Sequence, residues 1–532
     1  MDFLLSALRF LGVLFVVIMV FNLMIVVHEW GHFLAARRRG LKVEAFQIWF
    51  GKPIWKRTYN GVQYGLGCIP FGGFVKLPQM GPMDAIEGQS EDGEPLPPIT
   101  PLSKIIVAFA GPLFSFLLAV AFAVVVHFAG RNENTADTTR TIGYVQENSP
   151  AAKAGIRPND TVESIDGKKV KSFGGLVDSI KWLIVSSEGD TINFDIKRPG
   201  QDEILHFPVT PEKSDANSSA PQPQGFAWLV HKIFSRPPFR RVGIGPAYTV
   251  TVNGFMANSP NAPAQQAGLQ PQDRLLKADD VPLYCAETLA EYLAGHVGKT
   301  INFEVKRGEQ TLTIPVTTRL PDERPKNWTE VDGRLHLAEG EQPKTLTPET
   351  EEAALSTLGA IIEVGEMKPK HPGVGEQLLN AARTISQTLH SITSPKSDLS
   401  AQHLSGVVGI VHTYVVLLDN PSGWWVGLQQ VLWFSVVLNV NLAMLNLLPF
   451  PVLDGGHIVM ALFEWVRRRP VNLRLLEVVQ TACVVLLLFF MLFVTVKDTG
   501  DLFGASQRPK DGKQTQEQNV TPKFTAPAAQ AH

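Results

Sequence analysis

Residues 11–32 read LGVLFVVIMVFNLMIVVHEWGH, and this stretch decides the fold because it joins a membrane-length apolar segment to a metal-binding pattern. Leu11–Val27 contains no charged residue and one strongly polar residue, Asn22. A helix of that length and composition can cross the hydrocarbon core of a bilayer. The N-terminus carries Asp2 and lacks a basic region, so we expect this helix to be retained rather than cleaved as a signal peptide.

The pattern His-Glu-x-x-His follows directly, with His28 and His32 at positions i and i+4. Both imidazoles then lie on one face of the helix and can bind one zinc ion, while Glu29 can act as a general base. An ordinary histidine pair on an apolar helix is the alternative. Ionisable residues at membrane depth are costly and usually functional, which favours the metal site.

Three further segments are apolar over a membrane-spanning length, so the sequence predicts four transmembrane helices. The predicted spans are residues 5–35, 104–129, 425–448 and 475–496. Arginines cluster after the first span and between the third and the fourth. Positive residues flank spans on the cytoplasmic side. We therefore expect both termini, and the long segment between spans two and three, to face the periplasm of a Gram-negative inner membrane.

Residues 41–80 are rich in aromatic and β-branched residues around Asn60-Gly61, which is a strong hairpin signal. The segment ends in Gly72-Gly73, where glycines permit close backbone approach. We expect a hairpin beside the metal site whose free edge pairs with an extended substrate. A purely structural hairpin is the alternative.

An internal repeat occupies much of residues 130–320. The segment SPAAKAGIRPNDTVESIDGKKV at 149–170 resembles APAQQAGLQPQDRLLKADDVPL at 262–283, and TINFDIKR at 191–198 returns as TINFEVKR at 300–307. Two copies of one small domain are expected from such a repeat. The recurring residues are Pro150, Gly155, Pro158 and Asp160 in the first copy and Pro263, Gly268, Pro271 and Asp273 in the second.

The short strands around these repeats resemble bacterial PDZ domains, which commonly bind peptides by strand addition. The segments TIGYVQENS and TVNGFMANS, which precede the two copies, are then expected to form the carboxylate-binding loops and edge strands. A tandem that only limits the size of the substrate is equally consistent with the pattern.

Residues 439–459, NVNLAMLNLLPFPVLDGGHIV, end the third span. Two prolines break the helix there, and broken backbone at membrane depth is tolerated where it lines a cavity or is buried in protein. Asp454 follows the break and needs a partner, whereas the two histidines need a third zinc ligand. Both motifs precede an arginine cluster, so both lie toward the cytoplasmic side. His457 is a competing ligand.

The patterns predict a polytopic α-helical membrane protein with four transmembrane helices, a membrane-associated β-hairpin and two inserted α+β PDZ-like domains. The expected divisions are 1–130 for two spans and the hairpin, 131–212 and 241–320 for the repeats, 213–240 and 321–360 for linkers, 361–420 for membrane-surface helices, 421–500 for the last spans and 501–532 for a disordered tail. The net charge of −2 gives no support for a nucleic-acid partner, and three distant cysteines give no disulfide framework.

In combination the motifs resemble the site-2 protease family of intramembrane zinc metalloproteases, in its bacterial regulator-of-sigma-E branch with tandem PDZ domains. The resemblance covers most of the chain and keeps the family's order and spacing. It rests on HEWGH at 28–32, PFGGFVK at 70–76, AGP at 110–112, the repeats and NLLPFPVLDGG at 446–456.

The resemblance implies His28, His32 and Asp454 as zinc ligands and Glu29 as the general base. Asn446 matches a family asparagine linked to substrate positioning or transition-state stabilisation, and Asn441 is a second candidate for that role. The hairpin, with Gly72, Gly73 and Phe74, is implied to hold the substrate.

Two positions depart from the family pattern. Ser115 stands where the family usually has asparagine, and Val407 replaces the proline of a Ser-Gly-Pro motif. We expect these changes to affect helix packing and substrate accommodation more than chemistry.

The expected activity is hydrolysis of a peptide bond in or near the transmembrane segment of a single-span membrane protein, such as a pre-cleaved anti-sigma factor or a signal-peptide remnant. Peptide C-termini at the PDZ-like domains are further expected partners. The alternative is a membrane-anchored PDZ scaffold with an inactive metal site.

Overall fold

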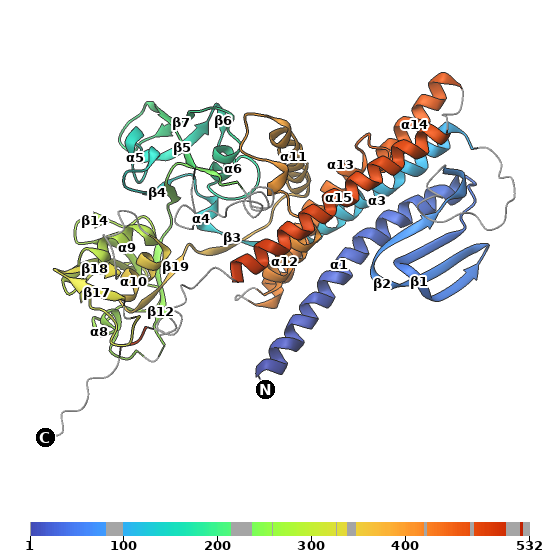
Figure 1. The fold of residues 1–532 in the computed structure, drawn as a ribbon. Coiled ribbons are helices and arrows are strands. Elements are labelled where there is room, and N and C mark those ends of the chain that lie inside the picture. Colours follow the sequence, from blue (N-terminus) through green and yellow to red (C-terminus); the bar gives the residue numbers. More distant parts are fainter. Residues whose placement is uncertain are drawn as a thin grey trace, which may run out of the picture. The chain divides into compact units, whose positions relative to one another are not determined.

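The structure is a computed structural model that describes residues 2–80, 99–213, 237–257, 259–325, 327–337, 347–419, 423–468, 473–506 and 522–524 (Figure 1). The chain divides into two compact units. The membrane unit comprises Met1–Asn132, Pro369–Leu389 and Leu404–Leu502, and the repeat unit comprises Glu133–Lys368, His390–His403 and Phe503–His532.

Four helices in the described part of the membrane unit are long and apolar enough to cross a bilayer, as predicted. They are α1 (Asp2–Arg38), α3 (Pro101–Ala129), α13 (Trp424–Asn446) and α15 (Leu473–Ser506), with apolar spans at Leu11–Arg38, Pro101–Ala129, Trp424–Asn446 and Val478–Gly500. The unit also holds α12 (Val407–Leu418), α14 (Asp454–Arg467) and most of α11 (Val374–Thr393). Large apolar side chains such as Leu486 and Phe489 on α15 are each 69% exposed, which fits contact with lipid.

Helices α1 and α3 pack at very short range because small residues lie at their contact. A Cβ atom on Gly31 of α1 would lie 2.4 Å from the carbonyl oxygen of Ala110 on α3. Helix α3 begins with Thr100 as its N-cap, with Pro101 in the first turn, and ends at Gly130 with φ +73°. The glycine in the histidine motif is therefore a helix-contact residue.

The predicted hairpin is present as β1 (Ala45–Tyr59) and β2 (Val62–Lys76), joined by Asn60-Gly61, both with positive φ. Both strands bend, so the first residues of β1 pair with the beginning and the end of β2: Phe46 lies opposite Tyr64 and opposite Val75. The end of β2 thereby becomes an outer strand of this sheet. The 3₁₀ helix Pro78–Met80 follows.

The repeat unit contains two similarly ordered α+β repeats with separate hydrophobic cores. The sheet orders are β6-β5-β7-β8 in the first repeat and β16-β15-β13-β12-β19 in the second, with β14 paired to β13. The helices of this unit are α4 (Thr135–Thr138), α5 (Pro150–Ala154), α6 (Ile180–Val185), α8 (Pro263–Gln266), α9 (Ala286–Ala294) and α10 (Pro348–Ser356), with a 3₁₀ helix at Ala401–His403.

The strands from the first repeat to the start of the second are β3 (Arg131–Asn134), β4 (Ile142–Val145), β5 (Thr161–Ile165), β6 (Lys168–Lys169), β7 (Ile192–Lys197), β8 (Ile204–Val209), β9 (Glu212–Lys213), β10 (Arg240–Arg241) and β11 (Ile244–Pro246). Those of the second repeat and the chain after it are β12 (Val250–Phe255), β13 (Arg274–Ala278), β14 (Val281–Pro282), β15 (Thr300–Arg307), β16 (Gln310–Thr317), β17 (Trp328–Val331), β18 (Arg334–Leu337), β19 (Ala360–Val364) and β20 (Met367–Lys370).

The same buried ion-pair arrangement occurs in both repeats. In the second, Arg307 donates to both carboxylate oxygens of Asp273, at 2.7 and 2.6 Å, and to the carbonyl of Gly268 at 2.8 Å. In the first, Arg198 makes the corresponding bonds to Asp160 and to the Gly155 carbonyl. The aspartates and glycines that recur in the sequence are therefore the residues of this clamp.

The prediction that TIGYVQENS and TVNGFMANS form the edge strands of the repeats is wrong. Strand β4 lies between β11 and β5, and β12 lies between β13 and β19, so TIGYVQENS and TVNGFMANS supply inner strands. Each outer strand comes from chain that follows the repeat, at 244–246 and 360–364, beyond the expected limits of 212 and 320. Local sequence patterns do not indicate that a later segment of the chain pairs with a strand of an earlier repeat.

The expected linker at 321–360, the expected surface-helix segment at 361–420 and the tail also differ from their predictions where the chain is described. Strands β17 and β18 form a hairpin within 321–360, and its Trp328 and Leu335 join the second core. Residues 361–420 contribute β19 and β20 before any helix begins. Most of the 213–240 linker lies outside the described residues. In the tail, α15 continues to Ser506 and Phe524 is fully buried.

We expect Asp273→Asn to destabilise the second repeat, because it removes the carboxylate of the Arg307–Asp273 ion pair. Asp273 is 1% exposed, so the variant leaves Arg307 without its carboxylate partner, and we expect the repeat unit to lose about 2–3 kcal/mol of unfolding free energy. Thermal unfolding of the full chain in detergent, followed by protease resistance of the repeats, measures the loss. Asp332→Asn, at an exposed turn with φ +50°, is the matched control. Equal unfolding temperatures for both variants would contradict the clamp's role.

The same variant should also change the pH dependence of stability. Burial by itself would raise the pKa of Asp273, but hydrogen bonds from Arg307 and the Gln270 amide outweigh it and hold the pKa below its usual value. The folded-state pKa is therefore below the unfolded value of about 3.9. The stabilisation is fully present above about pH 4 and is lost as the pH falls through the folded pKa. We expect the difference between wild type and Asp273→Asn to shrink in acid.

We expect Gly31→Ala to destabilise the contact between helices α1 and α3. The added methyl group would meet the Ala110 carbonyl, so α1 and α3 must separate, and we expect a loss of about 1–3 kcal/mol. Gly12→Ala on the same helix is the control, because a Cβ added there would have no neighbouring atom within 4 Å. Thermal unfolding of both variants in detergent tests this; a Gly31→Ala protein as stable as Gly12→Ala would show that the helices do not need this approach.

Candidate metal centre and active site

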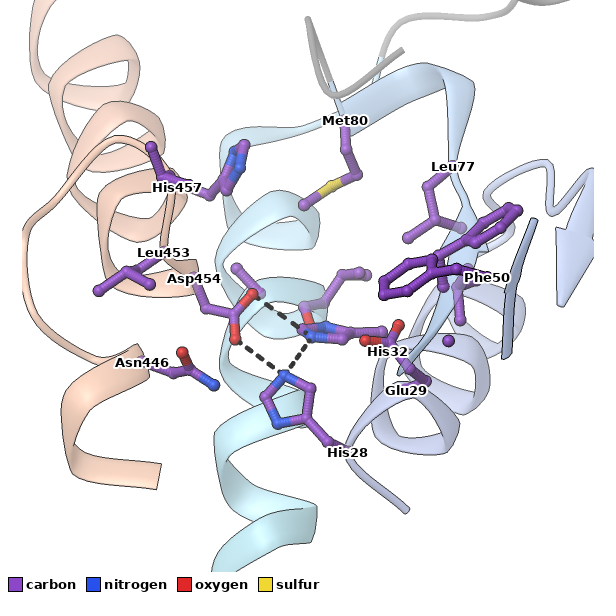
Figure 2. Close-up of a pocket in the computed structure, with 16 residues that line it drawn as sticks. His28, Glu29, His32, Phe50, Leu77, Met80, Asn446, Leu453, Asp454 and His457 are labelled. Carbon is purple, nitrogen blue, oxygen red and sulfur yellow. Dashed lines mark hydrogen bonds and ion pairs between the residues drawn. The ribbon is translucent and has the colours of Figure 1, made fainter. Parts of the chain in front are cut away.

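The three predicted ligands converge in the membrane unit (Figure 2). The Nε2 atoms of His28 and His32 lie 3.2 Å apart. Nε2 of His28 is 3.3 Å from Oδ2 of Asp454, and Nε2 of His32 is 3.3 Å from Oδ1 of the same carboxylate. Among the described residues this is the one group of three or more histidine, cysteine, aspartate or glutamate side chains close enough to hold a metal ion.

Asp454 reaches the histidines because the chain between α13 and α14 folds back tightly. A Cβ on Gly455 would lie 2.3 Å from the Leu447 carbonyl oxygen, and one on Gly456 would lie 2.1 Å from that of Phe450. Asp454 is the first residue of α14, directly after this turn. The two glycines therefore let the helix begin where its first side chain can meet α1.

The other imidazole nitrogens are held by helix α3. Nδ1 of His32 lies 2.8 Å from the carbonyl oxygen of Val107, and Nδ1 of His28 lies 2.9 Å from Oγ of the buried Ser115. A carbonyl oxygen only accepts, so Nδ1 of His32 carries a proton, and in the neutral imidazole Nε2 then presents the lone pair that a metal requires. Ser115, whose departure was expected to affect helix packing and substrate accommodation more than chemistry, thus contacts a predicted ligand directly.

The arrangement fits zinc. Two ligands bound at 2.0–2.1 Å in a tetrahedron lie about 3.3 Å apart, which matches the separations between these donor atoms. Lone pairs of two imidazoles and a carboxylate repel one another at this range unless a cation or protons lie between them. Gly111 keeps the space open, since a Cβ there would lie 2.2 Å from Nε2 of His32 and 2.8 Å from that of His28.

A cavity of about 360 Å³ lies against the ligands, and Glu29 lines it. Val75, near the end of β2, lines the same cavity as Glu29. Figure 2 shows Glu29 and the two histidines on the same side of the cavity, with Phe50 close by. The other lining residues are Gly73, Phe74, Leu77, Met80, Val107, Ala108, Asn446, Val452, Leu453 and His457.

The structure separates the remaining predicted site residues. Gly73, Phe74 and Asn446 line the cavity, whereas Gly72 and Asn441 do not. Gly72 has φ +83°, and a Cβ there would lie 1.9 Å from the Phe50 ring, so it shapes the strand and lets that ring pack. It therefore acts on the cavity through Phe50.

His457 lines the cavity but does not belong to the ligand group. Its imidazole follows Asp454 by one turn of α14 and is 7% exposed. Sequence reasoning missed the Val107 carbonyl, because a backbone group carries no side-chain signal. It also missed the role of Ser115, for which the departure from the family pattern was the available signal.

Comparisons with known proteins identify the family of this chain. The family model of peptidase family M50 matches residues 16–490. The regulator of sigma-E protease RseP of Escherichia coli K12 is 27% identical over 86% of this chain and 91% of its own length. A Chlamydia pneumoniae protein described as a zinc metalloprotease is 26% identical over 91% of this chain and 98% of its own length.

A regulator of sigma E protease from Haemophilus influenzae is 26% identical over 89% of this chain and 95% of its own length. The family match covers most of the chain, includes both halves of the predicted metal centre and reaches into each of the four apolar spans described above. The chain belongs to peptidase family M50, the site-2 proteases, and is a multi-pass membrane zinc metalloprotease.

Proposed function

We propose that His28, His32 and Asp454 hold the zinc ion and that Glu29 is the general base of an intramembrane peptidase. The observation that carries this assignment is the convergence of the three donor atoms at the wall of a cavity that Glu29 also lines. Zinc in such a site polarises a peptide carbonyl and lowers the pKa of water. Glu29 takes a proton from the attacking water and returns it to the leaving amine.

The outer edge of β2 is the proposed substrate-binding strand. The carbonyl of Lys76 accepts a hydrogen bond from the Glu44 amide. The backbone polar groups of Lys76 therefore face the neighbouring strand of the sheet. Backbone groups alternate along a strand, so those of Val75 and Gly73 face away from it. The backbone groups of Gly73 and Val75 are therefore the ones that would pair with an unwound substrate segment. Asn446 is the proposed positioning residue at the opposite wall.

Ser115 is the proposed positioning residue for His28. Zinc binding needs the lone pair of Nε2, so Nδ1 must carry the proton and Ser115 Oγ must accept it. The asparagine usual at this position in the family also offers an acceptor oxygen. The departure at residue 115 therefore preserves the hydrogen bond that the ligand requires.

The proposed substrates are single-span membrane proteins already shortened by another protease, such as an anti-sigma factor stub, or signal-peptide remnants. A helix embedded in lipid has no free backbone groups, so unwinding is costly and pairing with β2 offsets part of that cost. The repeats, as PDZ-like domains on the periplasmic side, would exclude intact ectodomains or bind peptide C-termini. Both chain termini are proposed to be periplasmic in the inner membrane, with the active site toward the cytoplasm.

Substitution of Glu29 and Asp454 tests the central assignment. Wild type, Glu29→Gln and Asp454→Asn are compared in liposomes for cleavage of a tagged single-span stub, with zinc quantified in each. We expect Glu29→Gln to keep its zinc and to cleave at least about 100-fold more slowly, because the base is absent. Asp454→Asn should lose both zinc and activity.

Glu376→Gln, at an exposed position on α11, is the control and should behave as wild type. If Glu29→Gln cleaves as fast as wild type, Glu29 is not the base. A wild-type protein that binds no zinc and cleaves no stub would favour the alternative of a membrane-anchored scaffold with an inactive metal site.

The Ser115 assignment is tested by metal affinity, measured by chelator competition in the Glu29→Gln background. Ser115→Ala should weaken zinc binding by about 10–100-fold because it removes the acceptor for Nδ1 of His28. Ser115→Asn should restore it. Ser435→Ala is the control, since Ser435 is also fully buried but bonds to Tyr414 and to the Val431 carbonyl. Unchanged affinity in a folded Ser115→Ala protein would show that Ser115 does not position the ligand.

A further inference from the structure

Residues Pro522–Phe524 lie on the second repeat. Lys523 and Glu323 exchange both backbone hydrogen bonds, at 3.1 and 2.9 Å, as neighbouring residues of an antiparallel sheet do. The side chains of the same two residues form an ion pair with nitrogen and oxygen 3.7 Å apart. The next amide, that of Phe524, donates to Oγ of Ser259 at 3.0 Å.

The Phe524 side chain is the anchor of this contact. It is 0% exposed and is one of the largest fully buried side chains in the described chain. The guanidinium of Arg319 lies over its ring, 4.6 Å from the centroid. Gly359, with φ +70°, borders the ring, and a Cβ there would lie 2.9 Å from a ring carbon and 2.7 Å from the Cβ of Ala262.

The receptor residues come from three separate loops of the repeat: Ser259 and Ala262, Arg319 and Glu323, and Gly359. Each kind of contact matches a different feature of the ligand. The Glu323 backbone matches an extended chain, its carboxylate matches a basic side chain, and the enclosed site beside Arg319 matches an aromatic ring. A phenylalanine near a chain terminus is not buried this completely without a site that fits it.

We propose that the second repeat contains a peptide-binding site for an extended basic-aromatic segment, and that Pro522–Phe524 of the same chain is its resident ligand. The site is distinct from the metal centre and does not depend on the proposed catalytic roles. Helix α15 ends at Ser506, so docking closes a loop whose tether, from Ser506 to Pro522, can span at most about 55 Å. Short tethers give local ligand concentrations in the millimolar range, so the docked tail excludes weak competitors from the site.

Cysteine cross-linking in the full chain tests the docking. The two residues of a hydrogen-bonded antiparallel pair lie about 5.5 Å apart at Cα, which suits a disulfide. With Cys68 and Cys483 changed to Ser, we expect Glu323→Cys/Lys523→Cys to cross-link under mild oxidation. Adding Phe524→Ala should slow the reaction at least about tenfold, because a buried aromatic anchor is lost.

The matched control is Glu309→Cys/Lys523→Cys, because Glu309 is 99% exposed in the turn between β15 and β16. We expect this pair to cross-link no faster than the Phe524→Ala protein. Equal cross-linking rates for the Glu323 and Glu309 pairs, or a rate for the Glu323 pair that Phe524→Ala does not change, would overturn the proposal.

Competition with a peptide tests whether the site accepts a ligand in trans. The probe is a fluorescent peptide of residues 517–530, EQNVTPKFTAPAAQ. The full-length Phe524→Ala protein, whose own anchor is removed, should bind it at least about tenfold more tightly than wild type does. The same peptide with its phenylalanine changed to alanine should not bind. Equal binding of both peptides, or equal binding by both proteins, would show that the site is not a peptide receptor.

Discussion

The membrane unit depends on one electrostatic constraint. It brings the imidazoles of His28 and His32 and the carboxylate of Asp454 within 3.3 Å of one another, where their lone pairs repel. A cation removes this repulsion, and zinc fits the spacing. The donors come from the chain's first span and from the helix after its third, so the proposed zinc ion would join segments more than 400 residues apart, at 28 and 454. Helix α3 then fixes both imidazole orientations from a third direction.

Glycines make this convergence possible. Gly31 brings α1 against α3, Gly111 leaves space beside both imidazoles, and Gly455 with Gly456 folds the turn onto α14. At each position a Cβ would meet backbone or ligand atoms at 2.1–2.4 Å, so a single methyl group would move a helix or block the metal. Interiors at native packing density transmit such shifts rather than absorb them. The metal centre therefore depends on backbone approach as much as on its ligands.

The repeat unit follows a different principle, in which each repeat is closed by a strand that the chain supplies later. Residues 244–246 complete the first repeat and 360–364 the second, and Pro522–Phe524 adds a third returning segment. The Arg–Asp clamps, by contrast, hold each repeat from within, between its own strands and turn. Returning strands create sites at the joins between segments, and the Phe524 site is one of them.

The four spans, the hairpin turn at Asn60-Gly61, the duplicated unit and the residues proposed as zinc ligands and base could all be predicted from the sequence. These features depend on local composition, on i,i+4 spacing and on a complete family motif, all of which can be read along the chain. The three-dimensional arrangement was needed to show that Ser115 contacts His28 and that Val75 lines the cavity with Glu29. It was also needed to show that Gly72 and Asn441 do not line the cavity, and that strands after the repeats form their outer edges. Each of these features depends on which residues distant in sequence become neighbours in space. In addition, every residue type has the same backbone carbonyl, so the sequence does not indicate which backbone groups contact the site.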